Sequence, residues 1–159
     1  MIGNVDTTQL AAGLARWSRE IVEALGEGMG QAGAQLLNDA TQEIPTVPLL
    51  TGYLRGSGSV FVNGKIIATS PQGGAGGSPA TSDEYAEREG QIICRVGFNT
   101  VYAAVMHEGR WRTGPLAGVE IKNYREPGSG KYYLLTPLQE HREEYIQTAV
   151  DYAKAKLGM

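Results

Sequence analysis

The sequence predicts an α+β domain, in which a long N-terminal helix and a C-terminal helix pack on one face of a mostly antiparallel sheet. Two observations support this fold class. Apolar residues recur every three or four positions at both ends of the chain, and between them lie short apolar runs separated by glycine, proline and asparagine. With 159 residues, the chain suits a single domain that buries a substantial core.

A long amphipathic helix is expected over about residues 7–43. Its apolar stripe comprises Leu10, Leu14, Trp17, Ile21, Leu25, Met29 and Leu36. Four glycines between positions 26 and 33 fall inside it, each costing on the order of 1 kcal/mol relative to alanine. They either break the helix or let another backbone approach closely. We favour one helix with a weak middle, ending before Pro45, whose ring disfavours helical geometry at the preceding residue.

The sheet is expected within residues 53–125. Asn63-Gly64 lies between two apolar runs, which is the strongest short-range signal of a β-hairpin. Another strand is predicted over residues 91–98 and a central strand over residues 101–109, where apolar residues follow a period of two. Residues 119–121 are a candidate short strand. The glycine- and proline-bearing stretch 70–81 predicts a flexible loop or, alternatively, an arm that becomes ordered against a neighbouring subunit.

The C-terminal helix is predicted over about residues 136–157. Thr136 is the expected N-cap, Pro137 the first helical residue, and Gln139 completes a capping box. Gly158 follows the last turn, as is typical of a helix end.

Composition argues against several classes of function. The formal net charge of −3 disfavours an electrostatic grip on nucleic acid, which needs a concentrated basic face. One cysteine, Cys94, allows no internal disulfide. No apolar stretch approaches the length of a membrane span, so no membrane partner is expected. The charged fraction of 19% is low, which suits a subunit that covers much of its surface with neighbours.

We find no catalytic, cofactor-binding or metal-binding pattern. The segment Gly128-Ser129-Gly130-Lys131 lacks the serine or threonine that follows the lysine in a phosphate-binding loop. His107 and His141 are isolated, and with Cys94 they do not make a metal set. A hydrolase site assembled in space is the weakest alternative, because no serine lies in a strand–turn–helix elbow. We therefore expect no enzyme activity and no cofactor.

The candidate functional residues follow the predicted central strand. Arg110, Trp111 and Arg112 come directly after His107-Glu108-Gly109. Tryptophan and arginine are enriched at protein interfaces, so we assign these residues, with His107 and Glu108, to a candidate subunit interface. Two other interpretations stay open: a solvated loop whose tryptophan folds back on the domain, and a nucleic-acid contact through arginine and stacking.

Three short motifs occur along the chain in an order that suggests a family. A TG-x-LR-x-S segment covers residues 51–57, a Y-A-x-x-x-x-E-G segment covers residues 102–109, and Thr136-Pro137 follows an aromatic and apolar run. In this order, after a long helix that ends at a proline, the chain resembles the head–tail joining, or tail completion, proteins of long-tailed bacteriophages, which are also described as neck or minor capsid proteins. The resemblance covers most of the chain, and each motif is short.

The resemblance implies a structural role in the virion. Such proteins form rings at the neck, between the portal–connector stack and the tail tube, and leave a channel through which DNA passes without specific binding. A ring of six or twelve copies, made in the host cytoplasm, would then be expected, as tail terminator, connector or minor capsid subunit. Arg110 and Trp111 stand where that family often has threonine or serine. The alternative is a non-enzymatic ligand- or nucleic-acid-binding module that uses residues 110–112.

Overall fold

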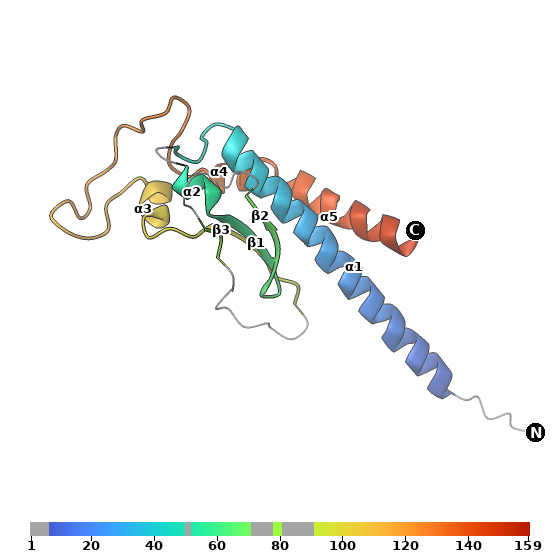
Figure 1. Cartoon of the computed structure of the whole chain (residues 1–159). Helices are drawn as coiled ribbons and strands as arrows, with labels where there is room; N and C mark the ends of the chain where they lie inside the picture. Colours follow the sequence, from blue (N-terminus) through green and yellow to red (C-terminus); the bar gives the residue numbers. More distant parts are fainter. Residues whose placement is uncertain (1–6, 50–51, 71–77, 81–90) are drawn as a thin grey trace, which may run out of the picture.

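A computed structural model describes residues 7–49, 52–70, 78–80 and 91–159. The long helix α1 (Thr7–Gln42) forms the main axis of the molecule, and its N-terminal part projects beyond the rest of the chain (Figure 1). A three-stranded antiparallel sheet lies beside its C-terminal half, with the strand order β2-β1-β3. The predicted α+β class is confirmed.

The predicted hairpin is also confirmed. Strand β1 (Gly58–Val62) pairs with β2 (Lys65–Thr69), and Asn63 and Gly64 form the turn with φ of 49° and 77°. Positive φ at both turn residues suits the right-handed twist of the two strands. Strand β3 (Cys94–Phe98) pairs with the other edge of β1 and begins three residues later than predicted. β1 is buried along its whole length, whereas β2 is largely exposed.

Helix α1 is unbroken, as predicted. Its glycines lie where other elements approach the helix closely. The Cβ of an alanine at position 28 would lie 2.2 Å from the carbonyl oxygen of Ala149 in helix α5 (Arg142–Leu157). At position 33 the Cβ would lie 2.6 Å from Val60 and 2.7 Å from the sulfur of Cys94. The glycines thus bring both the sheet and α5 against α1.

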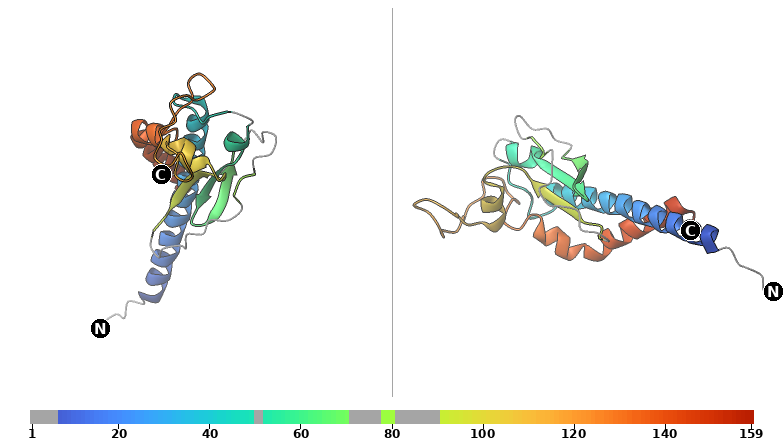
Figure 2. Two further views of the ribbon diagram at one scale, coloured as in Figure 1. Left: turned by 90° about the vertical axis from the view of Figure 1, so that its left-hand side faces the viewer. Right: turned by 90° about the horizontal axis from the view of Figure 1, so that it is seen from below.

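Two apolar clusters hold these layers together. In the first, Ala32 and Leu36 of α1 pack on Tyr145 and Ala149 of α5, and Val96 of β3 packs against the same cluster. The second joins the C-terminal end of α1 to the short helix α2 (Tyr53–Gly56) through Ala40, Val47, Leu54 and Tyr133. Figure 2 shows α5 running alongside α1, while the sheet lies on another side of that helix.

The predicted central strand over residues 101–109 is wrong, because this segment forms helix α3 (Ala103–Glu108). Its alternating pattern is only a few residues long, and so short an apolar run does not separate strand from helix. Adjacent Ala103 and Ala104 favour a helix, and Gly109 ends it in the left-handed conformation with φ of 66°. The candidate strand at residues 119–121 is also absent: one isolated bridge joins Arg110 to Glu120.

The predicted C-terminal helix is interrupted at His141. Helix α4 (Leu135–Glu140) precedes the break and α5 follows it, because the His141 backbone leaves helical geometry with φ of −108° and ψ of 17°. Thr136 is not the N-cap as predicted, since the chain already turns before it and its amide donates to the Tyr132 carbonyl at 2.8 Å. Gly158 ends α5 as expected. Of the predicted loop 70–81, only Ser70 and residues 78–80 lie within the described ranges.

Candidate functional site

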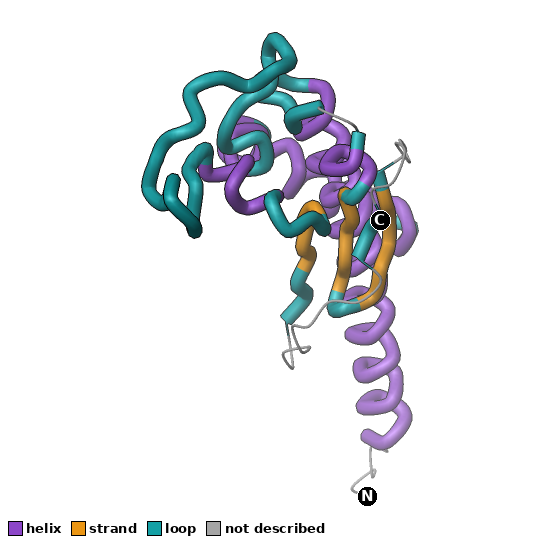
Figure 3. Tube along the Cα trace, turned by 60° about the vertical axis from the view of Figure 1, so that its left-hand side comes forward, coloured by secondary structure: helices purple, strands orange, loops and turns teal. Residues whose placement is uncertain are grey.

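Residues 110–120 form a long exposed loop, here called the arm, at the end of the molecule away from the α1 N-terminus (Figure 3). Its two sides are joined by backbone hydrogen bonds, from Trp111 to the Val119 carbonyl at 3.0 Å and from Gly118 to the Trp111 carbonyl at 2.8 Å. An ion pair of 2.7 Å between Lys131 and Glu120 fastens the base of the arm. The arm carries exposed Trp111, Leu116 and Val119, so apolar side chains face outward.

Glu108 and Arg112 form an ion pair at the start of the arm. The Arg112 guanidinium donates to both carboxylate oxygens, one bond being 3.0 Å long. These hydrogen bonds lower the pKa of Glu108 and raise that of Arg112. Because both side chains are exposed, the pair orients the arm without contributing much to stability.

His107 points the other way, into the interior. Its ring makes T-shaped contacts with two tyrosines: the distance between ring centroids is 5.9 Å to Tyr132 and 4.9 Å to Tyr133. The buried Nε2 atom has no hydrogen-bond partner among the described residues. Burial lowers the pKa of His107, against the opposing effect of the Glu108 charge. The imidazole is therefore neutral near pH 7 and leaves one ring nitrogen able to accept a hydrogen bond.

His107 lines an apolar groove of about 500 Å³ between α1, β3, α3, α4 and α5. Met29 and Gly33 of α1 line it, as do Leu135 and Leu138 of α4. The groove's polar groups are mostly engaged elsewhere: the Tyr133 hydroxyl donates to the Ala103 carbonyl and the Tyr145 hydroxyl to Asp39. Small-molecule sites usually hold several convergent polar groups, whereas the lining of this groove is mostly apolar and the His107 Nε2 atom is buried.

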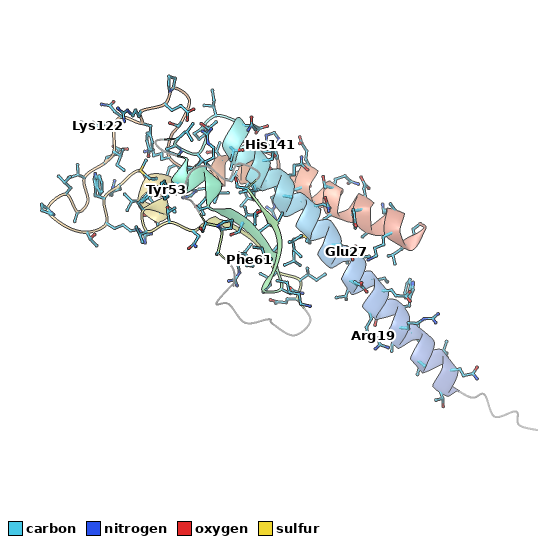
Figure 4. The ribbon with its side chains drawn as sticks, viewed as in Figure 1. Arg19, Glu27, Tyr53, Phe61, Lys122 and His141 are labelled. Atoms are coloured by element: carbon cyan, nitrogen blue, oxygen red, sulfur yellow. The ribbon has the colours of Figure 1, made fainter. Side chains whose placement is uncertain are left out.

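The N-terminal half of α1 presents a second apolar surface, here called the overhang and covering residues 8–23. Every one of these residues is exposed except Ile21, which is half-buried. Leu10, Leu14 and Trp17 keep 62%, 56% and 54% of their surface exposed. Figure 4 shows that the side chains around Arg19 stand clear of the other elements, whereas those around Glu27 lie close to α5. Of the predicted apolar stripe, three residues are therefore exposed, three are half-buried and only Leu36 is buried.

Arg55, a residue of the TG-x-LR-x-S motif, has a structural role. Its guanidinium donates to the Val47 carbonyl at 2.7 Å and to the Glu126 carboxylate at 2.9 Å. The arginine side chain is only 11% exposed. It thus ties the segment after α1 to the segment before α4, around the second apolar cluster.

The structure separates the predicted interface residues into two groups. Glu108, Arg110, Trp111 and Arg112 lie on or beside the arm, in contact with solvent. His107 instead lines the groove. Sequence reasoning missed the groove, which five elements build, and it also missed the exposure of the overhang. The signal in the sequence was the length of the apolar stripe of α1, which does not by itself say what covers the helix.

Within the described ranges, no three His, Cys, Asp or Glu side chains gather to hold a metal ion. No helix in those ranges is both long enough and apolar enough to cross a membrane. Comparison with protein-family models, with curated proteins and with solved structures finds no match to this chain.

Proposed function

We propose that this chain is a structural subunit of the neck of a long-tailed bacteriophage, which forms a ring with copies of itself between the portal–connector stack and the tail tube. DNA would pass through the ring without specific binding, and the subunit would carry no catalytic site. The order of the three motifs along the chain supports a location at the neck. The exposed surfaces support assembly.

The observation that carries the proposal is the overhang. An amphipathic helix normally buries its apolar stripe against its own domain. Here Leu10, Leu14 and Trp17 continue the buried stripe of α1 into solvent. Exposed apolar surface of this kind marks an interaction site. A chain that leaves such a stripe uncovered within the part that the structure describes is suited to an assembly.

The arm is a second exposed apolar surface, and it lies at the opposite end of the molecule (Figure 1). A ring requires two different surfaces on each subunit, because every copy contacts one neighbour with one surface and the next neighbour with another. Two projections at opposite ends can also reach the proteins above and below a ring. Trp111 and the Glu108–Arg112 pair are then available to the portal–connector or the tail tube.

The test uses a phage that encodes this chain. A nonsense mutation in the gene should yield filled heads and complete tails that do not join, and electron microscopy should show the chain at the neck of the wild-type particle. The purified protein should form rings of six or twelve copies with a central channel, either alone or with its neighbours. Particles that join heads to tails without the chain would refute the proposal.

The alternative, a binding module that uses residues 110–112, makes a different prediction. It requires DNA or ligand binding by the isolated protein that is lost in Arg110→Ala and Arg112→Ala variants. For DNA, that binding should also weaken steeply with salt. The neck proposal expects no such binding.

A further inference from the structure

Helix α3 and the arm, residues 103–121 and here called the α3–arm unit, are held to the rest of the subunit by three tyrosines. Three carbonyls of α3 accept hydrogen bonds from them: His107 from the Tyr132 amide at 2.7 Å, Ala103 from the Tyr133 hydroxyl and Met106 from the Tyr124 hydroxyl, each at 3.0 Å. The segment that carries these tyrosines is itself fixed, since Gly130 donates to the Thr46 carbonyl at 3.2 Å. The contact between α3 and the tyrosines therefore decides whether the unit lies against the body of the subunit.

The backbone on either side of this contact is suited to movement. Residues 99–102 turn from β3 into α3, and the side chain of Val101 in this turn is fully exposed, so it does not anchor the turn. Tyr132 has φ of 63°, a left-handed conformation that is costly for a residue with a Cβ. Strained residues of this kind are common where a structure switches between two states.

His107 lies at the centre of the contact. Its ring packs on the rings of Tyr132 and Tyr133, and its Nε2 atom is buried without a hydrogen-bond partner among the described residues. In the protonated ring both nitrogens carry a hydrogen, so Nε2 would become a buried donor on a charged group with no acceptor. Burying such a group is unfavourable, and opening the contact to water relieves the cost.

Among the described residues around His107, no other group changes its charge between about pH 7 and pH 5. These titratable groups are Glu108 of α3, Glu120 of the arm, Tyr124, Lys131, Tyr132 and Tyr133 of the following segment and, in the groove lining, Cys94 of β3 and Tyr145 of α5. Tyrosine and cysteine are neutral in this range, and lysine is charged. Hydrogen bonds from Arg112 and Lys131 lower the pKa of Glu108 and Glu120, so both stay ionised.

From these observations we infer that His107 is a proton-operated latch, which holds the α3–arm unit against the body when neutral and releases it when protonated. The inference goes beyond the neck proposal and does not depend on it. Burial lowers the pKa of His107 in the closed state, although the Glu108 charge opposes this. The closed state therefore keeps its full stability above about pH 6.5, the pKa of an unfolded histidine. Below that value its ratio to the open state falls by up to about tenfold per pH unit, until the lower pKa of the closed state is reached.

Hydrogen–deuterium exchange of the whole chain, followed by mass spectrometry, measures the release. The chain is labelled between pH 7.5 and pH 5, with labelling times scaled to the intrinsic exchange rate at each pH. Peptides from α3 and around Tyr132 should lose protection by up to about tenfold per pH unit below about pH 6.5, because so short a helix is not stable once it is undocked. Peptides from α5 are the internal reference and should keep their protection.

Two variants assign the effect to one histidine. His107→Phe keeps an aromatic ring on the tyrosines and cannot take up a proton, so protection of α3 should no longer depend on pH. His141→Gln is the matched control, because it removes the other histidine, which lies outside the α3–arm unit, and it should leave the pH dependence of α3 unchanged.

Proton NMR tests the latch without any change at position 107. The histidine ring resonance that remains in His141→Gln belongs to His107 and should titrate below about pH 6.5. Protection of α3 should fall between that pH and the pKa of this resonance, and level off below it.

Three results would overturn the inference. The first is a protection of α3 that stays constant between pH 7.5 and pH 5. The second is a loss of protection in acid that persists in His107→Phe. The third is an equal loss in α5, which would mean that the whole domain opens rather than the α3–arm unit. The neck proposal is unaffected by all three, because it is tested by the joining of heads to tails.

Discussion

Gly28 is the position at which a single methyl group most sharply tests the packing of α1 against α5. A Cβ at this position would lie 2.2 Å from the Ala149 carbonyl oxygen and 2.9 Å from its carbonyl carbon. Both atoms belong to the backbone of α5, so no side-chain rotation relieves the overlap. Gly28→Ala should therefore push the two helices apart or distort one of them.

The size of the effect follows from two opposing contributions. Overpacking a well-packed contact costs about 1–3 kcal/mol, and a backbone obstacle puts Gly28→Ala near the upper end of that range. Alanine in place of glycine in a helix returns about 1 kcal/mol. The free energy of unfolding should thus fall by about 2 kcal/mol, which lowers Tm by roughly 4–8 °C in a domain of this size.

Gly13→Ala is the matched control, because Gly13 lies in the same helix and a Cβ there would meet nothing within 4 Å. This variant should leave Tm unchanged or raise it, by at most about 1 kcal/mol of stability. Urea and thermal unfolding, followed by circular dichroism at one protein concentration, measure both variants. If Gly28→Ala stabilised the protein as much as Gly13→Ala, the close approach of α1 and α5 would be wrong.

Three further predictions concern single side chains. The hydrogen bond from His141 to Glu144 raises the pKa of His141, and Glu43 adds to this effect. The resulting stabilisation is complete below the pKa of the unfolded chain and is lost as pH rises through the raised folded value, so His141→Gln should lower Tm more at about pH 5.5 than at about pH 8.5. An equal loss at both pH values would contradict this prediction. Burial raises the pKa of the Cys94 thiol to about 11, so it should react with iodoacetamide much more slowly than a free thiol near pH 7.5. The rate should rise about tenfold per pH unit. A rate typical of a free thiol would contradict the burial of this residue. Arg55→Met should cost about 1–3 kcal/mol in urea unfolding, because it leaves the Val47 carbonyl and Glu126 unpaired, whereas Arg112→Met on the exposed arm should change stability little; equal effects would remove the structural role of Arg55.

Local turn and helix chemistry made much of the fold predictable. Asn63-Gly64 allows the positive φ values of a hairpin turn whatever surrounds it, so the pairing of β1 and β2 followed from two residues and their apolar flanks. The long apolar period of α1 was similarly decisive. Residues 101–109 failed because a few alternating aliphatic residues are compatible with both periods, and the two alanines and Gly109 pointed to the helix. At the break, His141 hydrogen-bonds Glu43, a residue 98 positions away, and no local pattern contains that contact.

The candidate site was less predictable, since periodicity reports that a helix face is apolar and does not report what covers it. Leu14 and Leu36 belong to one stripe in the sequence, yet Leu36 is buried in the first cluster and Leu14 is exposed. The groove is a property of five elements placed together. His107 was predicted at an interface because it is close to Trp111 in the sequence, but the structure puts the two residues on different surfaces.

The overhang also sets how assembly and folding are coupled. An isolated helix of about 12–15 residues is marginal in water, and most helical stability in proteins comes from packing. The overhang is about this long, and among the described residues only its last turn contacts another element, through half-buried Ile21 and the Glu23–Lys156 ion pair, so in a single chain its first turns should fray. Docking against another molecule would then order it, and part of the binding free energy would be used for that ordering. Helicity measured by circular dichroism should therefore rise with protein concentration, together with the mass from light scattering, and Leu14→Asp should abolish both changes. A mass that rises while helicity stays constant would mean that the overhang is already ordered alone, and the coupling would be absent.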